Sequence, residues 1–159
     1  MRLVSLAAIA ALALTAALPA SALTVETKLS AEFQTKLEKD YGTREAKILT
    51  DTLARKVEQA FAKQGVKADR VVVTIEDAKP NRPTMQQVID KPGLDAIRSI
   101  SLGGAELTGI AYDASGKEIG QLKYDWYESD LSNVIGSSTW SDARWTFDRF
   151  ANRFADKLS

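Results

Sequence analysis

Apolar residues recur along much of this chain with a period of two, the period of a β-strand. Alternating apolar and polar residues occupy 23–29, and a β-branched run at 70–78 repeats the pattern more clearly. Two further alternating stretches, 97–112 and 117–127, flank the four residues Asp-Ala-Ser-Gly at 113–116. Aspartate at the first position and glycine at the fourth are typical of a tight turn, so these two stretches are predicted to form a β-hairpin.

Four other stretches place apolar residues three or four positions apart, which predicts helices. They cover 30–41, 43–64, 85–90 and 141–158. Gly42 separates the first two, which are either one helix broken at this glycine or a pair of helices. The last stretch is the most regular, with a row of phenylalanine and alanine on one side and of basic residues on the other.

Residues at the starts of two helices fit known capping patterns. Thr84 and Gln87 form the T-x-x-Q pattern of a capping box, which predicts the start of the short third helix. Ser141 is predicted to cap the C-terminal helix, with Trp140 and Trp145 packing against each other across its first turn as a hydrophobic staple.

The order of these elements is β-α-β, short helix, β-β-α, which predicts one α+β domain over residues 23–159. We expect a mostly antiparallel sheet of about four strands, with the helices packed mainly on one face. The helical segment between the first two strands is compatible with a parallel crossover. The order of the strands in the sheet stays open.

Residues 1–22 have the pattern of a secretory signal peptide. Met1-Arg2 gives a positive start, 3–18 is an apolar stretch, and Ala20-Ser21-Ala22 places small residues at a cleavage site. We therefore predict cleavage after Ala22 and a periplasmic or secreted mature protein. The alternative is an uncleaved membrane anchor. It is disfavoured because the apolar stretch is rich in alanine and shorter than the roughly 20 residues of a spanning helix.

The composition excludes several classes of chemistry. The sequence contains no cysteine and no histidine, which rules out cysteine nucleophiles, Ser-His-Asp triads, Cys/His zinc sites and lipid anchoring at a cysteine. Lys and Arg together number 21, as do Asp and Glu, so no basic excess points to nucleic acid. We predict no cofactor and no metal ion, and a core stabilised by packing without disulfides.

Carboxylates are the main remaining candidates for acid–base chemistry. Glu106 is the most distinctive of them, because it lies between Ala105 and Leu107 in an otherwise apolar strand. Together with Asp125 it could form the carboxylate pair of a hydrolase if the fold held the two about 5–10 Å apart in a cleft. The alternative is ordinary surface charge on a strand, which we favour because a perturbed carboxylate usually requires a cleft.

Three apolar or aromatic residues, Leu122, Tyr124 and Trp126, share one face of the last strand. Extending the pairing from the turn places Gly104 opposite Trp126 and Glu106 opposite Tyr124. The aromatic face is either packed against a helix or open as a platform for a partner or a sugar. In the second case the opposite face, with its small residues, would take the C-terminal helix.

Arg82 lies in the segment Asn81-Arg82-Pro83-Thr84. Its guanidinium suits a carboxylate or a phosphate, so Arg82 is a candidate ligand-binding residue. The alternative is a rigid turn followed by a helix cap, which is favoured because the capping box already accounts for Thr84. The chain has no phosphate-binding glycine loop, serine–lysine motif or calcium-loop pattern.

Several short motifs lie in the later part of the chain: Asn81-Arg82-Pro83-Thr84, Pro92-Gly93-Leu94-Asp95, Gly103-Gly104-Ala105, Tyr124-x-Trp126-Tyr127-Glu128, and Thr139-Trp140-x-Asp142-Ala143 running into Phe150-Ala151. With these motifs the chain resembles small exported bacterial proteins of unknown function, which are periplasmic in Gram-negative cells. The resemblance covers residues 71–158 and implies an exported, single α+β domain. It implies no catalytic residue. Similar envelope proteins are often lipid-anchored, but this chain lacks the cysteine that such anchoring requires.

These observations predict a soluble periplasmic binding or envelope-associated module without enzymatic activity. Its partner would be an unknown envelope protein or a small ligand. The candidate binding residues are Arg82, Glu106, Tyr124 and Trp126. Two alternatives stay open: a carboxylate-dependent hydrolase of glycans or esters, and a small-ligand carrier with an apolar pocket between the sheet and the helices.

Overall fold

A computed structural model describes residues 22–159, so the signal peptide predicted for residues 1–22 lies outside the described residues apart from Ala22. The strands are β1 (Thr24–Leu29), β2 (Arg70–Lys79), β3 (Gly104–Tyr112) and β4 (Glu118–Tyr127). The helices are α1 (Ala31–Lys36), α2 (Arg44–Gln64), α3 (Met85–Asp90) and α4 (Ser141–Leu158). A π-helical turn, Leu37–Tyr41, continues α1, and a 3-10 turn, Leu131–Val134, precedes α4.

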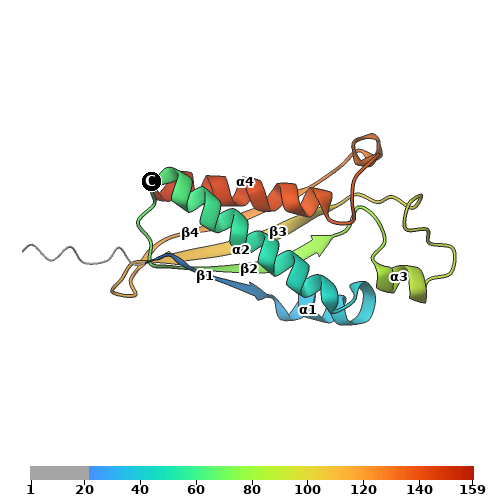
Figure 1. The fold of residues 1–159 in the computed structure, drawn as a ribbon, viewed down its shortest axis with the longest axis horizontal. Helices are drawn as coiled ribbons and strands as arrows, with labels where there is room; N and C mark the ends of the chain where they lie inside the picture. Colours follow the sequence, from blue (N-terminus) through green and yellow to red (C-terminus); the bar gives the residue numbers. More distant parts are fainter. Residues whose placement is uncertain (1–21) are drawn as a thin grey trace, which may run out of the picture.

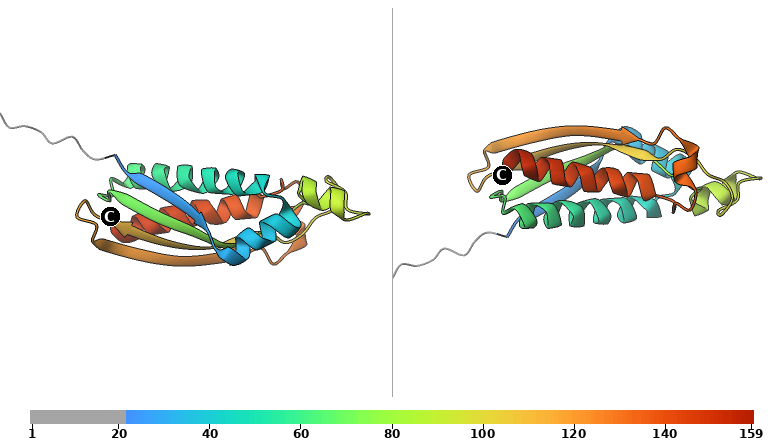
Figure 2. Two further views of the ribbon diagram at one scale, coloured as in Figure 1. Left: turned by 90° about the horizontal axis from the view of Figure 1, so that it is seen from below. Right: turned by 90° about the horizontal axis from the view of Figure 1, so that it is seen from above.

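The strands form one sheet in the order β1-β2-β3-β4. β1 is parallel to β2, and the other neighbouring pairs are antiparallel. Helices α2 and α4 lie side by side on one face of this sheet (Figures 1 and 2). The predicted α+β fold, with a mostly antiparallel four-stranded sheet, is therefore confirmed. No helix within the described part of the chain is both long and apolar enough to cross a membrane.

The core lies between the sheet and the two long helices. From α4 come three fully buried phenylalanines, Phe147, Phe150 and Phe154, as the pattern of this helix predicts. Gly109 of β3 lets α4 approach closely, because a Cβ at this position would lie 2.6 Å from the ring of Phe150 and 2.7 Å from that of Phe154. Burying a large apolar side chain in this way stabilises the fold by about 1.5–3 kcal/mol.

The β3–β4 hairpin has the predicted turn but a different register. At the turn, the Asp113 N–H donates to the Lys117 carbonyl (2.9 Å). Beyond it, Ala111 pairs with Gly120, so Ile119 is an extra residue that forms a β-bulge. The register predicted by counting outward from the turn ignores this bulge. It is therefore wrong by one residue over the rest of β4.

The one-residue shift exchanges the two faces of β4, because successive side chains of a strand point to opposite sides. Ala105 pairs with Trp126, and Glu106 pairs with Asp125. Tyr124 and Trp126 therefore share the helix-covered face with Ala105 and the other small residues of β3. Of the two alternatives for the aromatic face, packing against a helix is confirmed, and an open face opposite the small residues is wrong.

Two other local predictions have different outcomes. Thr84 and Gln87 form the predicted capping box at the start of α3. The strand predicted from residue 97 begins only at Gly104, because the preceding residues form a loop in which the Ser101 N–H donates to the carbonyl of Asn81, just after β2.

The start of α4 also differs from the prediction. The helix begins at Ser141 itself, and Trp140 occupies the capping position. Trp140 is buried and donates from Nε1 to Glu45 Oε2 (2.7 Å). Trp145 packs instead on Trp126 of β4, with 4.3 Å between the ring centres. The two tryptophans thus contact different elements and do not form the predicted staple.

Candidate functional site

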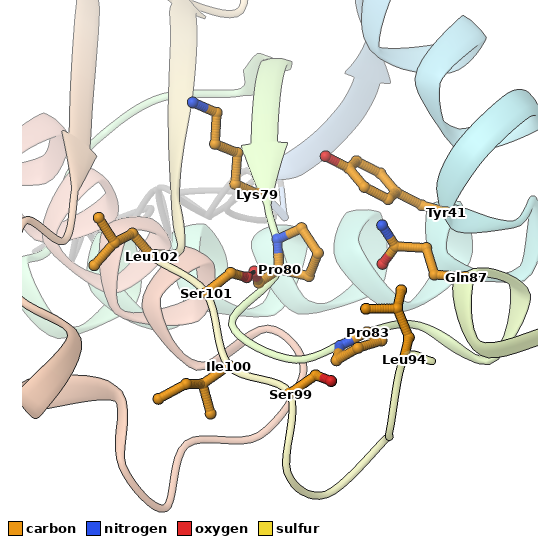
Figure 3. Close-up of a pocket in the computed structure, with 10 residues that line it drawn as sticks. All are labelled: Tyr41, Lys79, Pro80, Pro83, Gln87, Leu94, Ser99, Ile100, Ser101 and Leu102. Carbon is orange, nitrogen blue, oxygen red and sulfur yellow. Dashed lines mark hydrogen bonds between the residues drawn. The ribbon is translucent and has the colours of Figure 1, made fainter. Parts of the chain in front are cut away.

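A groove opens at the end of the sheet where β2 stops and a long connection through α3 leads to β3. This end, the loop end, lies opposite the end at which β1 begins and α4 stops (Figure 1). The groove has a volume of about 290 Å³, close to the lower end of the usual range for small-ligand sites. Its lining residues are Tyr41, Lys79, Pro80, Pro83, Gln87, Leu94, Ser99, Ile100, Ser101 and Leu102 (Figure 3).

The walls of this loop-end groove are largely apolar. Tyr41, Gln87 and Leu94 lie on the side of α3, and Ile100 and Leu102 lie on the side of β3 (Figure 3). Apolar walls with a few polar groups are the usual composition of a site that binds a small molecule or a short peptide segment.

Two polar groups give the groove its chemistry. Burial, with a further effect of the Asp77 carboxylate, raises the pKa of the Tyr41 hydroxyl above its usual value, so Tyr41 remains a neutral donor. The Lys79 ammonium lies 5.0 Å from the centre of the Tyr127 ring. Within residues 22–159, no carboxylate lies within 4 Å of this ammonium. Lys79 is exposed and can therefore meet an anionic group of a ligand.

A buried polar network holds the walls of the groove in place. Asn81 is fully buried, and its N–H donates to the Thr139 carbonyl (2.7 Å) while its carbonyl accepts from the Ser101 N–H (2.8 Å). Its side-chain amide donates to the Asp142 carboxylate and accepts from the Asp142 N–H (2.9 Å). These bonds tie the end of β2 to the loop before β3 and to the start of α4. The groove is therefore preorganised, which lowers the cost of binding.

Arg82, a predicted binding residue, belongs to this supporting network. Its Nε donates to the Ser137 carbonyl, and its Nη1 donates to the Ile97 carbonyl. The guanidinium thus joins the loop after α3 to the loop before α4. This geometry gives Arg82 a positioning role beside the groove, and direct contact between Arg82 and a ligand stays a prediction.

Several large apolar side chains at the loop end are exposed. Met85 and Ile89 of α3, Ile97 of the following loop and Ile135 after the 3-10 turn are 67–79% exposed. Single exposed apolar residues are common, whereas several from neighbouring segments are typical of a contact surface. These side chains give the loop end an exposed apolar surface of the kind that binds partners.

Glu106 lies on the opposite, open face of the sheet in a row of carboxylates. Asp77, Glu106 and Asp125 are paired in register across β2, β3 and β4. The Lys36 ammonium is 2.8 Å from Asp77, and the Lys123 ammonium is 2.7 Å from Glu106. These two lysines compensate the repulsion that like charges on neighbouring strands would cause.

The carboxylate row borders a polar cleft of about 510 Å³. Glu106, Asp77, Glu76 and Lys36 are among the residues that line it, but Asp125 is not. The two carboxylates of the hydrolase hypothesis are thus neighbours on adjacent strands that do not line this cleft together. A hydrolytic role for Glu106 stays a prediction, and no further geometry in the described residues supports it.

Tyr124 and Trp126 lie on the helix-covered face, close to the free edge of β4. Both are half-buried. Trp126 packs on Trp145, and the guanidinium of Arg153 lies 4.7 Å from the centre of the Tyr124 ring. Part of each side chain remains exposed, and a role in binding stays a prediction for both.

The four predicted residues therefore do not form one site. Only Tyr124 and Trp126 lie together; Glu106 is on the other face and Arg82 is at the loop end. Sequence reasoning missed the loop-end groove because its lining residues come from separate segments of the chain. The one local signal was the pair of prolines, Pro80 and Pro83, which end β2 and shape the connection.

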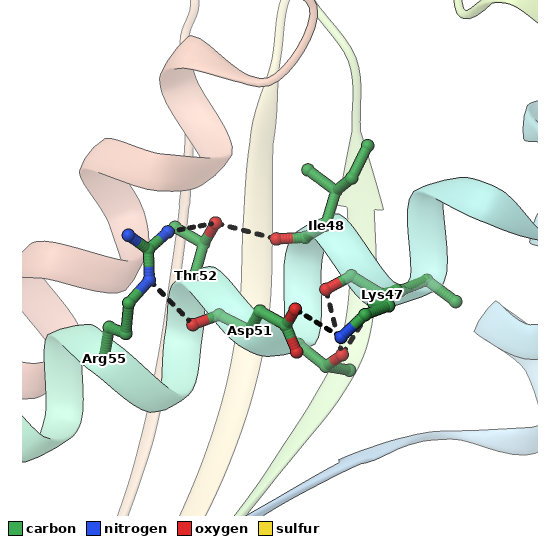
Figure 4. A network of polar contacts seen from close by, with 7 residues as sticks. Lys47, Ile48, Asp51, Thr52 and Arg55 are labelled. Atoms are coloured by element: carbon green, nitrogen blue, oxygen red, sulfur yellow. Dashed lines mark hydrogen bonds and ion pairs between the residues drawn. The ribbon is translucent and has the colours of Figure 1, made fainter.

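One further polar cluster is local to a single helix. On α2, the Lys47 ammonium lies 2.7 Å from Asp51, and the Thr52 hydroxyl donates to the Ile48 carbonyl (2.7 Å; Figure 4). These partners are four positions apart on one helix, where such contacts contribute a few tenths of a kcal/mol. No group of acidic residues within 22–159 is arranged to hold a metal ion.

No model of a known protein family and no curated protein sequence matches this chain. The resemblance to small exported bacterial proteins therefore stays a prediction.

Proposed function

We propose that this protein is a periplasmic binding module without enzymatic activity, and that it binds an anionic ligand with an apolar portion in the loop-end groove. The observation that supports this most directly is the apolar groove beside an unpaired cation, Lys79. A ligand carboxylate would approach the Lys79 ammonium, and the apolar portion would lie between Leu94 and Leu102. The pattern of residues 1–22 supports export.

A surface groove suits this role better than a pocket between the sheet and the helices. That space is filled by fully buried side chains, among them Phe33, Phe61 and Phe150. A ligand there would displace them at a cost of several kcal/mol. The carrier alternative, with a deep internal pocket, is therefore less well supported than binding at the loop end.

Titration of the processed protein, beginning at Leu23, with octanoate tests the proposal by amide NMR. We expect shifts at Lys79, Leu94 and Leu102. Lys79→Met should weaken binding about three- to tenfold, because an exposed charge pair contributes roughly 0.2–1 kcal/mol and slightly more in a partly apolar groove. Lys67→Met is the matched control, since Lys67 is also exposed but precedes β2 at the other end of the sheet.

Two results would contradict the proposed ligand class. One is that octylamine binds as tightly as octanoate; the other is that the shifted amides lie outside the loop end. Export is tested separately by the N-terminal sequence of the protein recovered from a periplasmic fraction, which we expect to begin at Leu23.

A further inference from the structure

β4 is an outer strand of the sheet, and its far edge has no partner strand within residues 22–159. The Glu128 N–H donates to a carbonyl just before β3 (2.9 Å), and alternate residues of an antiparallel strand direct their backbone groups to opposite sides. The N–H and C=O groups of Gln121, Lys123 and Asp125 therefore point away from β3. Of these groups, the Gln121 carbonyl accepts a hydrogen bond from Lys157 Nζ (2.7 Å).

Three basic residues of α4 follow this edge, and we call them the cationic row: Arg149, Arg153 and Lys157. The guanidinium of Arg149 lies 3.6 Å from the centre of the Trp145 ring, and that of Arg153 lies 4.7 Å from the Tyr124 ring. Within residues 22–159, none of the three is within 4 Å of a carboxylate. Aromatic contacts thus hold the two arginines beside β4, and the hydrogen bond to the Gln121 carbonyl holds Lys157 there.

The spacing of the cationic row fits an extended chain. Residues four apart on an α-helix are about 6 Å apart along its axis, and alternate residues of a strand are about 6.6–6.8 Å apart. α4 runs along β4 in the opposite direction, with Trp145 on Trp126 at one end and Lys157 on Gln121 at the other (Figure 2). A strand added beside β4 would therefore bring every second side chain close to one cation of the row.

We propose that the edge of β4, together with the cationic row, binds an extended acidic segment of a partner protein by strand addition. The free backbone groups of Lys123 and Asp125 pair with the added strand. Acidic side chains at alternate positions of that strand face Arg149, Arg153 and Lys157. This surface is separate from the loop-end groove, and it gives Tyr124 and Trp126 a place beside the bound segment.

A second copy of this chain fits the same edge less well. Pairing β4 with β4 about a two-fold axis would bring the two cationic rows toward each other, and like charges at an interface are unfavourable. Basic residues beside a free strand edge can also serve to prevent its pairing with other chains. This explanation accounts for Lys157, which covers a carbonyl of the edge. It does not account for Arg149 and Arg153, whose guanidinium groups lie over rings while the outward backbone of Lys123 and Asp125 stays open.

The test uses the processed protein and a short synthetic peptide that alternates glutamate with valine. We expect binding by fluorescence anisotropy, and slower hydrogen exchange at the outward amides of Lys123 and Asp125. Two control peptides should not bind: one with lysine in place of glutamate, and one with a central proline, which cannot complete the backbone pairing. Affinity for the acidic peptide should fall with added salt.

Variants of the protein separate charge from backbone pairing. Arg149→Gln with Arg153→Gln should weaken peptide binding about tenfold, whereas Arg55→Gln with Lys63→Gln, two exposed residues of α2, should not. Gln121→Pro removes one outward N–H without a change of charge and should also weaken binding. Thermal melts establish that each variant is folded.

Three outcomes would overturn the proposal. The acidic peptide shows no binding at millimolar concentration, or the lysine peptide binds equally well. In the third, Lys123 and Asp125 become protected without peptide as the protein dimerises, which would assign the edge to a second copy.

Discussion

The two faces of the sheet are stabilised by different forces. On the helix-covered face, residues such as Val73 and Leu107 are completely buried against the helices. On the open face, the same two strands carry Asp77 and Glu106, which are held by ion pairs with lysines. Burial of apolar area involves no ionisable group and so does not change with pH, whereas exposed ion pairs depend on both pH and salt.

The helix-covered face therefore provides most of the stability of the fold, and the charged surfaces are left for recognition. A buried large apolar side chain contributes about 1.5–3 kcal/mol, and an exposed ion pair contributes roughly 0–1 kcal/mol. Charges on the open face and along the edge of β4 can therefore change with little loss of stability. The helix-covered face has no such freedom, because close-packed interiors respond to a change of a single methylene.

The largest effect should come from Phe150→Ala, which removes a fully buried ring from the centre of the helix-covered face. We expect the free energy of unfolding to fall by about 3–5 kcal/mol in urea denaturation. Ile110→Ala, on the open face of β3, is the matched change, and it should cost about 1 kcal/mol or less. Equal losses for the two variants would mean that the open face is also covered in solution.

A smaller difference in the free energy of unfolding is expected between alanine substitutions at two glycines of the helix-covered face. At Gly109 an added methyl would press on the Phe150 and Phe154 rings, so Gly109→Ala should cost about 1–3 kcal/mol. At Gly120 it would meet only the end of the Leu158 side chain, which can turn aside. Gly120→Ala should therefore change the free energy of unfolding by less than about 0.5 kcal/mol. The reverse order in denaturation curves would contradict the packing of α4 on β3.

The smallest effect concerns the open face and is visible only at alkaline pH. Burial and the nearby Asp77 carboxylate raise the pKa of Tyr127 above its ordinary value of 10.0, and the hydrogen bond with Asp77 raises that of Lys36 above 10.5. A group whose pKa is raised by folding contributes stability that is fully present below its pKa in the unfolded chain. This contribution is lost as the pH rises from that value through the pKa of the folded protein. Stability should therefore decline above about pH 10.

Tyr127→Phe tests this contribution, because phenylalanine does not ionise. Between about pH 9 and pH 11 its free energy of unfolding should decline less steeply than that of the wild type, by under about 1 kcal/mol because the hydroxyl is half-exposed. Leu107→Ala, on the helix-covered face, should lower stability equally at both pH values. Parallel pH profiles for Tyr127→Phe and the wild type would show that the hydroxyl does not titrate with folding.

Much of the fold could be predicted from the sequence because its signals are local. The β-branched run of β2, the turn at Asp113 and the phenylalanine row of α4 each lie within a few adjacent residues. The two bulges were not predictable in this way. Glu76 and Ile119 are extra residues within apparently regular alternation, so the alternation alone does not reveal where the pairing shifts.

The candidate site was less predictable than the fold. Arg82 was chosen for its charge, but its Nε and Nη1 donate to the carbonyls of Ser137 and Ile97, which are far away in sequence. Lys79 carries no local motif, and its importance comes from the absence of a nearby carboxylate after folding. Both cases depend on contacts between distant segments, which periodicity and motif spacing do not encode.

The bulge at Ile119 makes this hairpin tolerant of a change in length at one position. The turn fixes the pairing of Tyr112 with Glu118, and packing under α4 fixes that of Ala111 with Gly120. Ile119 lies between these two pairs and is itself paired with no residue of β3. In evolution, a deletion of this residue would leave every other pair in place, whereas a deletion later in β4 would turn its aromatic residues toward solvent. Deletions in related sequences should therefore occur at this position and not later in β4.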